Sequence, residues 1–184
     1  ISEREAKHPS LPPPAVDECR HVFYSAVQEQ QLAQFGTNFE EYLLAGARDL
    51  LQLLSQQRNK KVVLVTANEQ PQAEWVTEKV DIAKYFTDVI GYPTVMDEGQ
   101  SLSKATIMAD YLQRHAIPPA NAVFIGDGVS DIKYGQEAQV HTIGVANTLQ
   151  GGNDLIARGA EYVVCHTTDL VKHFSLLFGP PAPE

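Results

Sequence analysis

The sequence has little of what marks secreted, zinc-binding or membrane-spanning chains. It has only two cysteines, Cys19 and Cys165, which form neither a CxxC pair nor a zinc-binding spacing. Two free thiols fit a reducing compartment, with a single disulfide as the alternative. No apolar run approaches the roughly 20 residues that cross a bilayer. We therefore expect a cytoplasmic protein without a membrane partner.

Basic residues are also scarce, because 14 Lys and Arg stand against 23 Asp and Glu, giving a formal net charge of -9. A nucleic-acid binder that relies on a broad basic face needs the opposite balance, so we expect no nucleic-acid partner. The balance does not exclude a small phosphorylated ligand, since a local pocket can be positive on an acidic protein. The chain of 184 residues is long enough for one domain with a substantial core.

Strand and helix patterns alternate along most of the chain. Short apolar runs rich in β-branched residues predict buried parallel strands at 62–65, 88–91, 122–126, 141–145 and 162–164. Amphipathic segments predict helices at 47–54, 72–84, 103–115, 132–138, 153–159 and 168–177. This alternation predicts an α/β fold, with a Rossmann-like, three-layer parallel sheet and helices on both faces.

The first candidate site follows the strand at 62–65. Catalytic groups in parallel sheets gather at the carboxyl ends of the strands, and here Thr66, Ala67 and Asn68 occupy that place. A hydroxyl and successive backbone N–H groups in the turn before a helix can hold an anion. The alternative is an ordinary helix N-cap, which for an isolated Thr is the commoner role.

The second candidate is Lys104, at the start of the helix predicted at 103–115. A lysine in this place could bring its ammonium group against a phosphate or a nearby carboxylate. The alternative is a solvated surface lysine. By itself, therefore, Lys104 carries little information.

The third candidate is an acidic pair in the segment Gly126-Asp127-Gly128-Val129-Ser130-Asp131, which follows the strand at 122–126. The glycines on either side of Asp127 allow a tight turn. Carboxylate oxygens at an exposed strand end suit a hard divalent cation, above all Mg²⁺ with retained waters. The alternative is a helix-capping turn in which Asp127 or Ser130 is the N-cap.

Taken in this order, the three segments resemble motifs II, III and IV of the haloacid dehalogenase superfamily. Other segments resemble the subgroup that contains phosphoglycolate phosphatase and β-phosphoglucomutase. These are the re-entry helix at 45–51, without the usual proline, the segment at 84–91, and the terminal segment at 155–164. The likeness covers residues 40–178.

The resemblance implies a role for each matching residue. Thr66 would hydrogen-bond the transferring phosphoryl group, helped by the amides of Ala67 and Asn68. Lys104 would hold the phosphate and neutralise charge beside the nucleophile. Asp127 would ligate Mg²⁺ directly, while Asp131 would act through a metal-bound water or orient Lys104. The implied activity is Mg²⁺-dependent hydrolysis of a small phosphorylated metabolite, by positioning and electrostatic stabilisation.

One part of the family pattern is absent. Motif I, DxDGT at the end of the first strand, supplies the aspartate that forms an aspartyl-phosphate and a second that acts as general acid and base. No DxD pair occurs in this sequence. Because the sequence opens where the family's cap lead-in opens, we expect the strand and its DxD pair to lie upstream of Ile1. As given, the chain should be inactive as a phosphatase.

Two other interpretations remain open. A catalytically dead relative would keep the fold for binding or regulation, and a response-regulator-like module would use Asp127 as a phosphoacceptor. The resemblance to haloacid dehalogenases implies that the first central strand, between the strands that end at Thr66 and Asp127, is absent. The strands that end at Thr66 and Asp127 must then lose a ladder partner or pair with each other.

The resemblance also implies a division of the chain. We expect a lead-in and a partial helical cap over 1–44, the α/β core over 45–178 and a disordered tail over 179–184. A small cap covers less of a site. It would admit larger substrates, or leave closure to a neighbouring subunit in a homo-oligomer.

Overall fold

The structure is a computed structural model that describes residues 30, 39–58, 60–93 and 102–179. The chain divides into two compact units, Ile1–Thr37 and Asn38–Glu184. Apart from Gln30, the first unit lies outside the described residues, so the helical cap stays a prediction. The expected tail also lies outside them, except for Gly179.

Every strand predicted from the apolar runs is present, and all of the described strands pair in parallel. The strand β1 (Val63–Glu69) pairs with β2 (Asp88–Tyr92), while β3 (Val123–Gly126) pairs with β4 (His141–Val145), and β4 with β5 (Tyr162–Val164). Parallel strands need crossover connections, and helices supply them here. The predicted α/β fold is confirmed.

The strands form two separate ladders within the described residues. One sheet has the order β1-β2 and the other β3-β4-β5, with no ladder between β1 and β3. Burial is concentrated in the central strand β4, where Thr142, Ile143 and Gly144 are buried. By contrast, the apolar residues 63–65 of β1 are only half-buried, and Val123 of β3 is 42% exposed. The strands that end at Thr66 and Asp127 therefore do not pair with each other.

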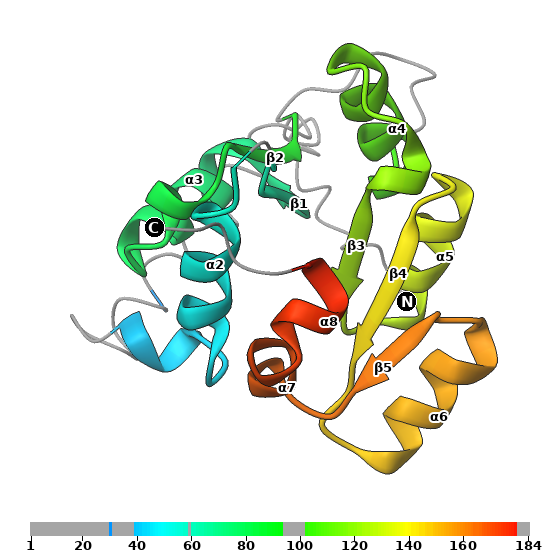
Figure 1. The fold of residues 1–184 in the computed structure, drawn as a ribbon. Coiled ribbons are helices and arrows are strands. Elements are labelled where there is room, and N and C mark those ends of the chain that lie inside the picture. The colour runs from blue at the N-terminus through cyan, green and yellow to red at the C-terminus, as the bar shows by residue number, and fades with distance from the viewer. Residues whose placement is uncertain (1–29, 31–38, 59, 94–101, 180–184) are drawn as a thin grey trace, which may run out of the picture. The chain divides into compact units, whose positions relative to one another are not determined.

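Helices cover both faces of the β3-β4-β5 sheet (Figure 1). Side chains of a strand alternate between faces, and those of β3 enter different clusters. Phe124 packs with Met108 and Leu112, whereas Ile125 packs with a cluster that contains Leu50 and Leu170. The helices in the described residues are α2 (Ala47–Ser55), α3 (Gln70–Lys79), α4 (Lys104–Arg114), α5 (Val129–Glu137), α6 (Leu149–Arg158), α7 (Thr167–Lys172) and α8 (Phe174–Phe178), with 3₁₀ turns η1 (Phe39–Tyr42), η2 (Ala83–Tyr85) and η3 (Pro119–Asn121).

The helix α4 touches both sheets. Its residues Met108 and Leu112 form a cluster to which Val65 of β1 and Phe124 of β3 both contribute. The hydroxyl of Tyr111 on α4 also donates to Asp88 Oδ2 of β2, at 2.5 Å. Burial, and then the bond to Asp88, raises the pKa of the Tyr111 phenol, so it remains a donor at neutral pH. The helix α4 therefore holds the two sheets to a common core.

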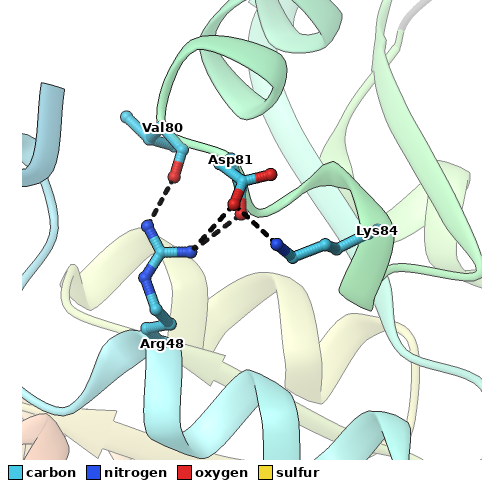
Figure 2. Close-up of polar contacts among 4 residues, drawn as sticks. All are labelled: Arg48, Val80, Asp81 and Lys84. Atoms are coloured by element: carbon cyan, nitrogen blue, oxygen red, sulfur yellow. Dashed lines mark hydrogen bonds and ion pairs between the residues drawn. The ribbon is translucent and has the colours of Figure 1, made fainter.

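The helix α3 ends at Lys79, earlier than the predicted 84. Asp81 has φ of 51°, in the left-handed region, so the right-handed helix cannot continue through it. Arg48 of α2 donates to Val80 O at 2.7 Å and to Asp81 O at 2.8 Å, as Figure 2 shows. Lys84 binds the Asp81 carboxylate at 2.6 Å. Arg48 and Asp81 are 33 residues apart in the sequence, so local periodicity could not predict that Arg48 binds the end of α3.

Other helix boundaries also differ from the prediction. The helix α5 begins at Val129 and α6 at Leu149, both earlier than expected, while the terminal helix is interrupted at His173. In α6, Thr148 is the N-cap and its Oγ1 accepts from Gly151 N at 3.1 Å. Leu149 is 84% exposed, so the first turn of α6 has no apolar periodicity to mark it. None of the helices in the described part of the chain has the length and apolar character that crossing a membrane requires.

Candidate active site

The acidic turn lies between β3 and α5, at the carboxyl end of the sheet. Asp131 is 6% exposed, and its Oδ2 accepts from Gly128 N at 3.1 Å. A Cβ on Gly126 would lie 2.4 Å from Asp131 Cβ, so a side chain at Gly126 would displace the carboxylate. Glycine at this position therefore lets Asp131 fold back against the turn that contains Asp127.

Lys104 is held against this turn from the start of α4. Ser103 is the N-cap of α4, and its Oγ accepts from Thr106 N at 3.2 Å while Thr106 Oγ1 accepts from Ser103 N at 3.0 Å. The capping box fixes where the first helical residue projects. Lys104 Nζ donates to Asp131 Oδ1 at 2.7 Å, with side chains 21% and 9% exposed. Partial burial makes this a charged contact with less solvent screening than a surface pair.

Thr66, Ala67 and Asn68 form a bulge in β1. Val65 pairs with Ile90, and Glu69 pairs with Tyr92. Three residues of β1 therefore lie between these pairs, opposite a single residue of β2. The extra residues leave the ladder, and Ala67 and Asn68 are exposed. Thr66 Oγ1 accepts from Asn68 N at 3.2 Å. The hydroxyl and one of the two predicted anion-binding amides therefore bond each other in this structure.

Tyr92 is the last residue of β2 and was not among the predicted site residues. The residue pairs with Glu69 at the far end of the bulge. Burial raises the pKa of its phenol, with a further rise from Tyr134, while the charge and backbone of Lys104 partly oppose the rise. Thr66 was selected because it directly follows an apolar run. Tyr92 directly follows the run at 88–91, so the same criterion would have selected it.

Asp127 differs from Asp131 in its surroundings. It is exposed, and within the described residues its carboxylate has neither a hydrogen-bond nor an ion-pair partner. Both oxygens of Asp131 are occupied, by Lys104 and by Gly128 N. No three His, Cys, Asp or Glu side chains among the described residues gather in a way that could hold a metal ion. The described residues thus offer a metal ion one free carboxylate, that of Asp127, in an exposed turn.

The predicted site residues are therefore joined to different degrees. Lys104 and Asp131 are in direct contact, and Asp131 lies over the glycines that flank Asp127. No hydrogen bond or ion pair joins Thr66 to Lys104 or Asp127 in the described part of the structure. The catalytic, phosphate-binding and metal roles of these residues remain predictions.

The comparisons with known proteins identify the family. A family profile described as haloacid dehalogenase-like hydrolase matches residues 6–136. A second profile, described as HAD-hydrolase-like, matches residues 103–170. The chain belongs to the haloacid dehalogenase-like hydrolase family, as its resemblance to motifs II to IV predicted. No curated protein sequence matches it.

Solved structures of this family share the fold. A protein from Clostridium acetobutylicum described as a predicted phosphatase has a TM-score of 0.63 at 22% identity, covering 72% of this chain and 60% of its own. A β-phosphoglucomutase-like protein from Thermotoga maritima has a TM-score of 0.62 at 21% identity, covering 73% and 60%. A HAD family hydrolase from Deinococcus radiodurans, solved with bound phosphate and sodium, has a TM-score of 0.59 at 16% identity, covering 72% and 59%. The chain thus spans less than two thirds of each of these neighbours.

Proposed function

We propose that this chain is the core of a phosphohydrolase that removes the phosphoryl group from a small phosphomonoester. The observation that carries the proposal is the contact between Lys104 and Asp131 at 2.7 Å, against the turn that contains Asp127. Phosphoryl transfer needs fixed positive charge and fixed hydrogen-bond donors more than covalent chemistry. A lysine held by a carboxylate at the carboxyl end of a parallel sheet supplies that charge.

The neighbouring groups have complementary tasks in this proposal. The Lys104 ammonium binds a phosphate oxygen, and Asp131 orients it through Oδ1. Thr66 and the amides of Ala67 and Asn68 donate to the remaining oxygens. For this, Asn68 N must exchange its present acceptor, Thr66 Oγ1, for the phosphate. The exchange keeps the number of hydrogen bonds constant, so binding an anion costs little polar desolvation at this amide.

The described residues fit part of a Mg²⁺ site. Mg²⁺ in phosphoryl-transfer sites keeps several waters and takes one or two carboxylates together with phosphate oxygens. Asp127 fits as a direct ligand because its carboxylate is free and exposed. Asp131 fits better as an orienting residue or through a water, because both of its oxygens already accept hydrogen bonds. When bound, the ion would neutralise charge on the phosphoryl oxygens.

The aspartyl-phosphate mechanism needs a further carboxylate, since the sequence contains no DxD pair. We place it on a strand that pairs with both β1 and β3. Among the described residues, β1 and β3 each have one edge without a ladder partner, which supports this placement. So does their partial exposure, because Val123 is 42% exposed and residues 63–65 are half-buried. A parallel strand in that position would end beside Thr66 and Asp127, where a nucleophile is needed.

The test is hydrolysis of a generic phosphomonoester by the full protein, with and without Mg²⁺, beside Asp127→Ala. We expect turnover that depends on Mg²⁺ and is lost in Asp127→Ala. Turnover that is equal in the variant and indifferent to chelation would rule out the proposed role of Asp127.

A second candidate is a phosphate-binding protein without catalysis, which the missing DxD pair favours. The two candidates separate in one experiment. A full protein that binds inorganic phosphate through Lys104 but releases none from any phosphomonoester would be the binding protein. The substrate itself, and whether the protein is a phosphatase or a phosphomutase, depend on residues beyond Thr66, Lys104 and Asp127.

A further inference from the structure

We propose that Gln70 is a positioning residue that holds the bulge of Thr66, Ala67 and Asn68 in the form that binds phosphate. The proposal rests on the proposed function, because it assigns a task toward the same phosphate. Gln70 is the first residue of α3 and directly follows β1. It acts on the bulge through the backbone of β2 and touches no substrate.

The side-chain amide of Gln70 uses all of its polar atoms. Its Oε1 accepts from Gly91 N at 2.6 Å, and its Nε2 donates to Val89 O at 2.9 Å. The same Nε2 donates to Glu74 Oε1 at 2.7 Å. The amide thus bonds one donor and one acceptor of β2, as a residue of a neighbouring strand would. It does so beside the place where β1 has left the ladder.

The backbone around these bonds is tightly packed. A Cβ on Gly91 would lie 2.7 Å from Asn68 O and 2.7 Å from Gln70 N. Both atoms are backbone, so no rotamer change could relieve the contact. The end of the bulge therefore packs directly against Gly91 of β2. The N–H of the same glycine donates to the side-chain amide of Gln70. Few other side chains could satisfy a backbone donor and a backbone acceptor at once.

This arrangement explains how exposed residues can have a defined conformation. Ala67 and Asn68 are exposed and lie outside the ladder, so neither burial nor strand pairing orders them. The amide of Gln70 anchors the chain two residues after Asn68. Anion binding by successive amides requires them to point one way before the ligand arrives, and a fixed anchor lowers the entropy that binding must remove.

The test compares Gln70→Met with Gln150→Met in the full protein. Methionine has nearly the same length as glutamine and makes none of the hydrogen bonds of the amide to Val89, Gly91 and Glu74. Gln150 is a matched control because it also lies in the first turn of a helix and bonds an acid four residues on, Asp154 Oδ1 at 2.7 Å, but its side chain makes no hydrogen bond to a strand among the described residues. The readouts are the dissociation constant of inorganic phosphate, from amide shifts of residues 67 and 68, and KM and kcat for a phosphomonoester.

We expect Gln70→Met to raise the phosphate dissociation constant and KM together, by about fivefold to tenfold, with kcat nearly unchanged. A purely structural role would lower the active fraction, which lowers kcat and leaves KM alone. Gln150→Met should match the wild type in both. If Gln70→Met does not fold, Gln70→Glu keeps the oxygen that accepts from Gly91 N, and the same division between KM and kcat is measured.

Two failures are distinguishable. If phosphate does not shift the amides of residues 67 and 68 in the wild type, the proposed phosphate site is wrong, and the role of Gln70 falls with it. If the wild type responds and Gln70→Met binds phosphate equally well, the role of Gln70 alone is overturned.

Discussion

The two sheets end in different ways at the edge where the candidate site lies. The pairing of β3 with β4 continues residue by residue through Gly126, and the turn beyond it is fixed by the ion pair of Lys104 with Asp131. The pairing of β1 with β2 breaks after Val65. The bulge that follows is held by the side-chain amide of Gln70, which bonds the backbone of β2. One end positions charge through side chains, and the other positions backbone donors. A phosphate needs both.

The largest effect is expected where the charge is removed. Lys104→Met should lower kcat for a phosphomonoester in the full protein by about 10²- to 10³-fold, because the charge that stabilises the transition state is lost. Lys133→Met is the control, since Lys133 makes an exposed pair with Glu137 at 3.5 Å on α5. Steady-state kinetics measure the change. Equal activity of the two variants would separate Lys104 from the chemistry.

The next prediction compares the cores of the two sheets with one substitution. Leu170→Ala should reduce the free energy of unfolding by about 3 kcal/mol, because Leu170 is 0% exposed and packs with Leu50 and Ile143. Leu64→Ala in the half-buried β1 should cost about 1 kcal/mol. Denaturant unfolding measures both. A larger loss at Leu64 would mean that β1 is as well packed as the other sheet.

A glycine comparison sharpens the difference in backbone packing. Gly91→Ala should destabilise by about 2 kcal/mol, because the added methyl group would meet backbone atoms at 2.7 Å. Gly152→Ala in α6 has its nearest neighbours at 3.9 and 4.0 Å and should be neutral or slightly stabilising. Thermal unfolding of the two variants gives the result. If both behave alike, the close approach of β2 to the bulge is wrong.

These contrasts also show which features the sequence could predict. The strands β4 and β5 have the predicted bounds, because an apolar run with polar residues at each end defines a strand. The helix α4 begins at Lys104, one residue after the predicted start, because Ser103 is its N-cap. The bulge and the role of Gln70 could not be predicted, since they depend on where β2 lies. The end of α3 likewise depends on Arg48, which is distant in sequence.

Arg48 connects the regions that are compared here. It lies on α2, where Leu50 packs with the core of the β3-β4-β5 sheet, and it binds the end of α3, which follows β1. Arg48→Met should cost about 1 kcal/mol of unfolding free energy through two lost hydrogen bonds. Arg114→Met is the control, because among the described residues it loses a cation–π contact with Tyr111 at 5.9 Å and no hydrogen bond. A change in denaturant midpoint no larger than that of the control would refute the prediction.

The smallest effect is a pH dependence from the pair of His141, on β4, with Glu161. The hydrogen bond of His141 to Glu161 at 2.7 Å, and then the charge of Glu161, raises the pKa of the imidazole above 6.5. The protonated pair therefore stabilises the fold fully below about pH 6.5, and the contribution is lost as pH rises through the raised pKa. The difference in melting temperature between wild type and His141→Gln should shrink from pH 6 to about pH 8. A difference that stays constant would contradict it.

The central claim is that Thr66, Lys104 and Asp127 serve one phosphate, and a crystal structure of the full protein with Mg²⁺ and inorganic phosphate tests it most directly. The account predicts one anion that touches both Lys104 Nζ and the amides of residues 67 and 68, with the metal ion on Asp127. A phosphate bound at Lys104 with the bulge turned away from it, or bound elsewhere, would contradict the account.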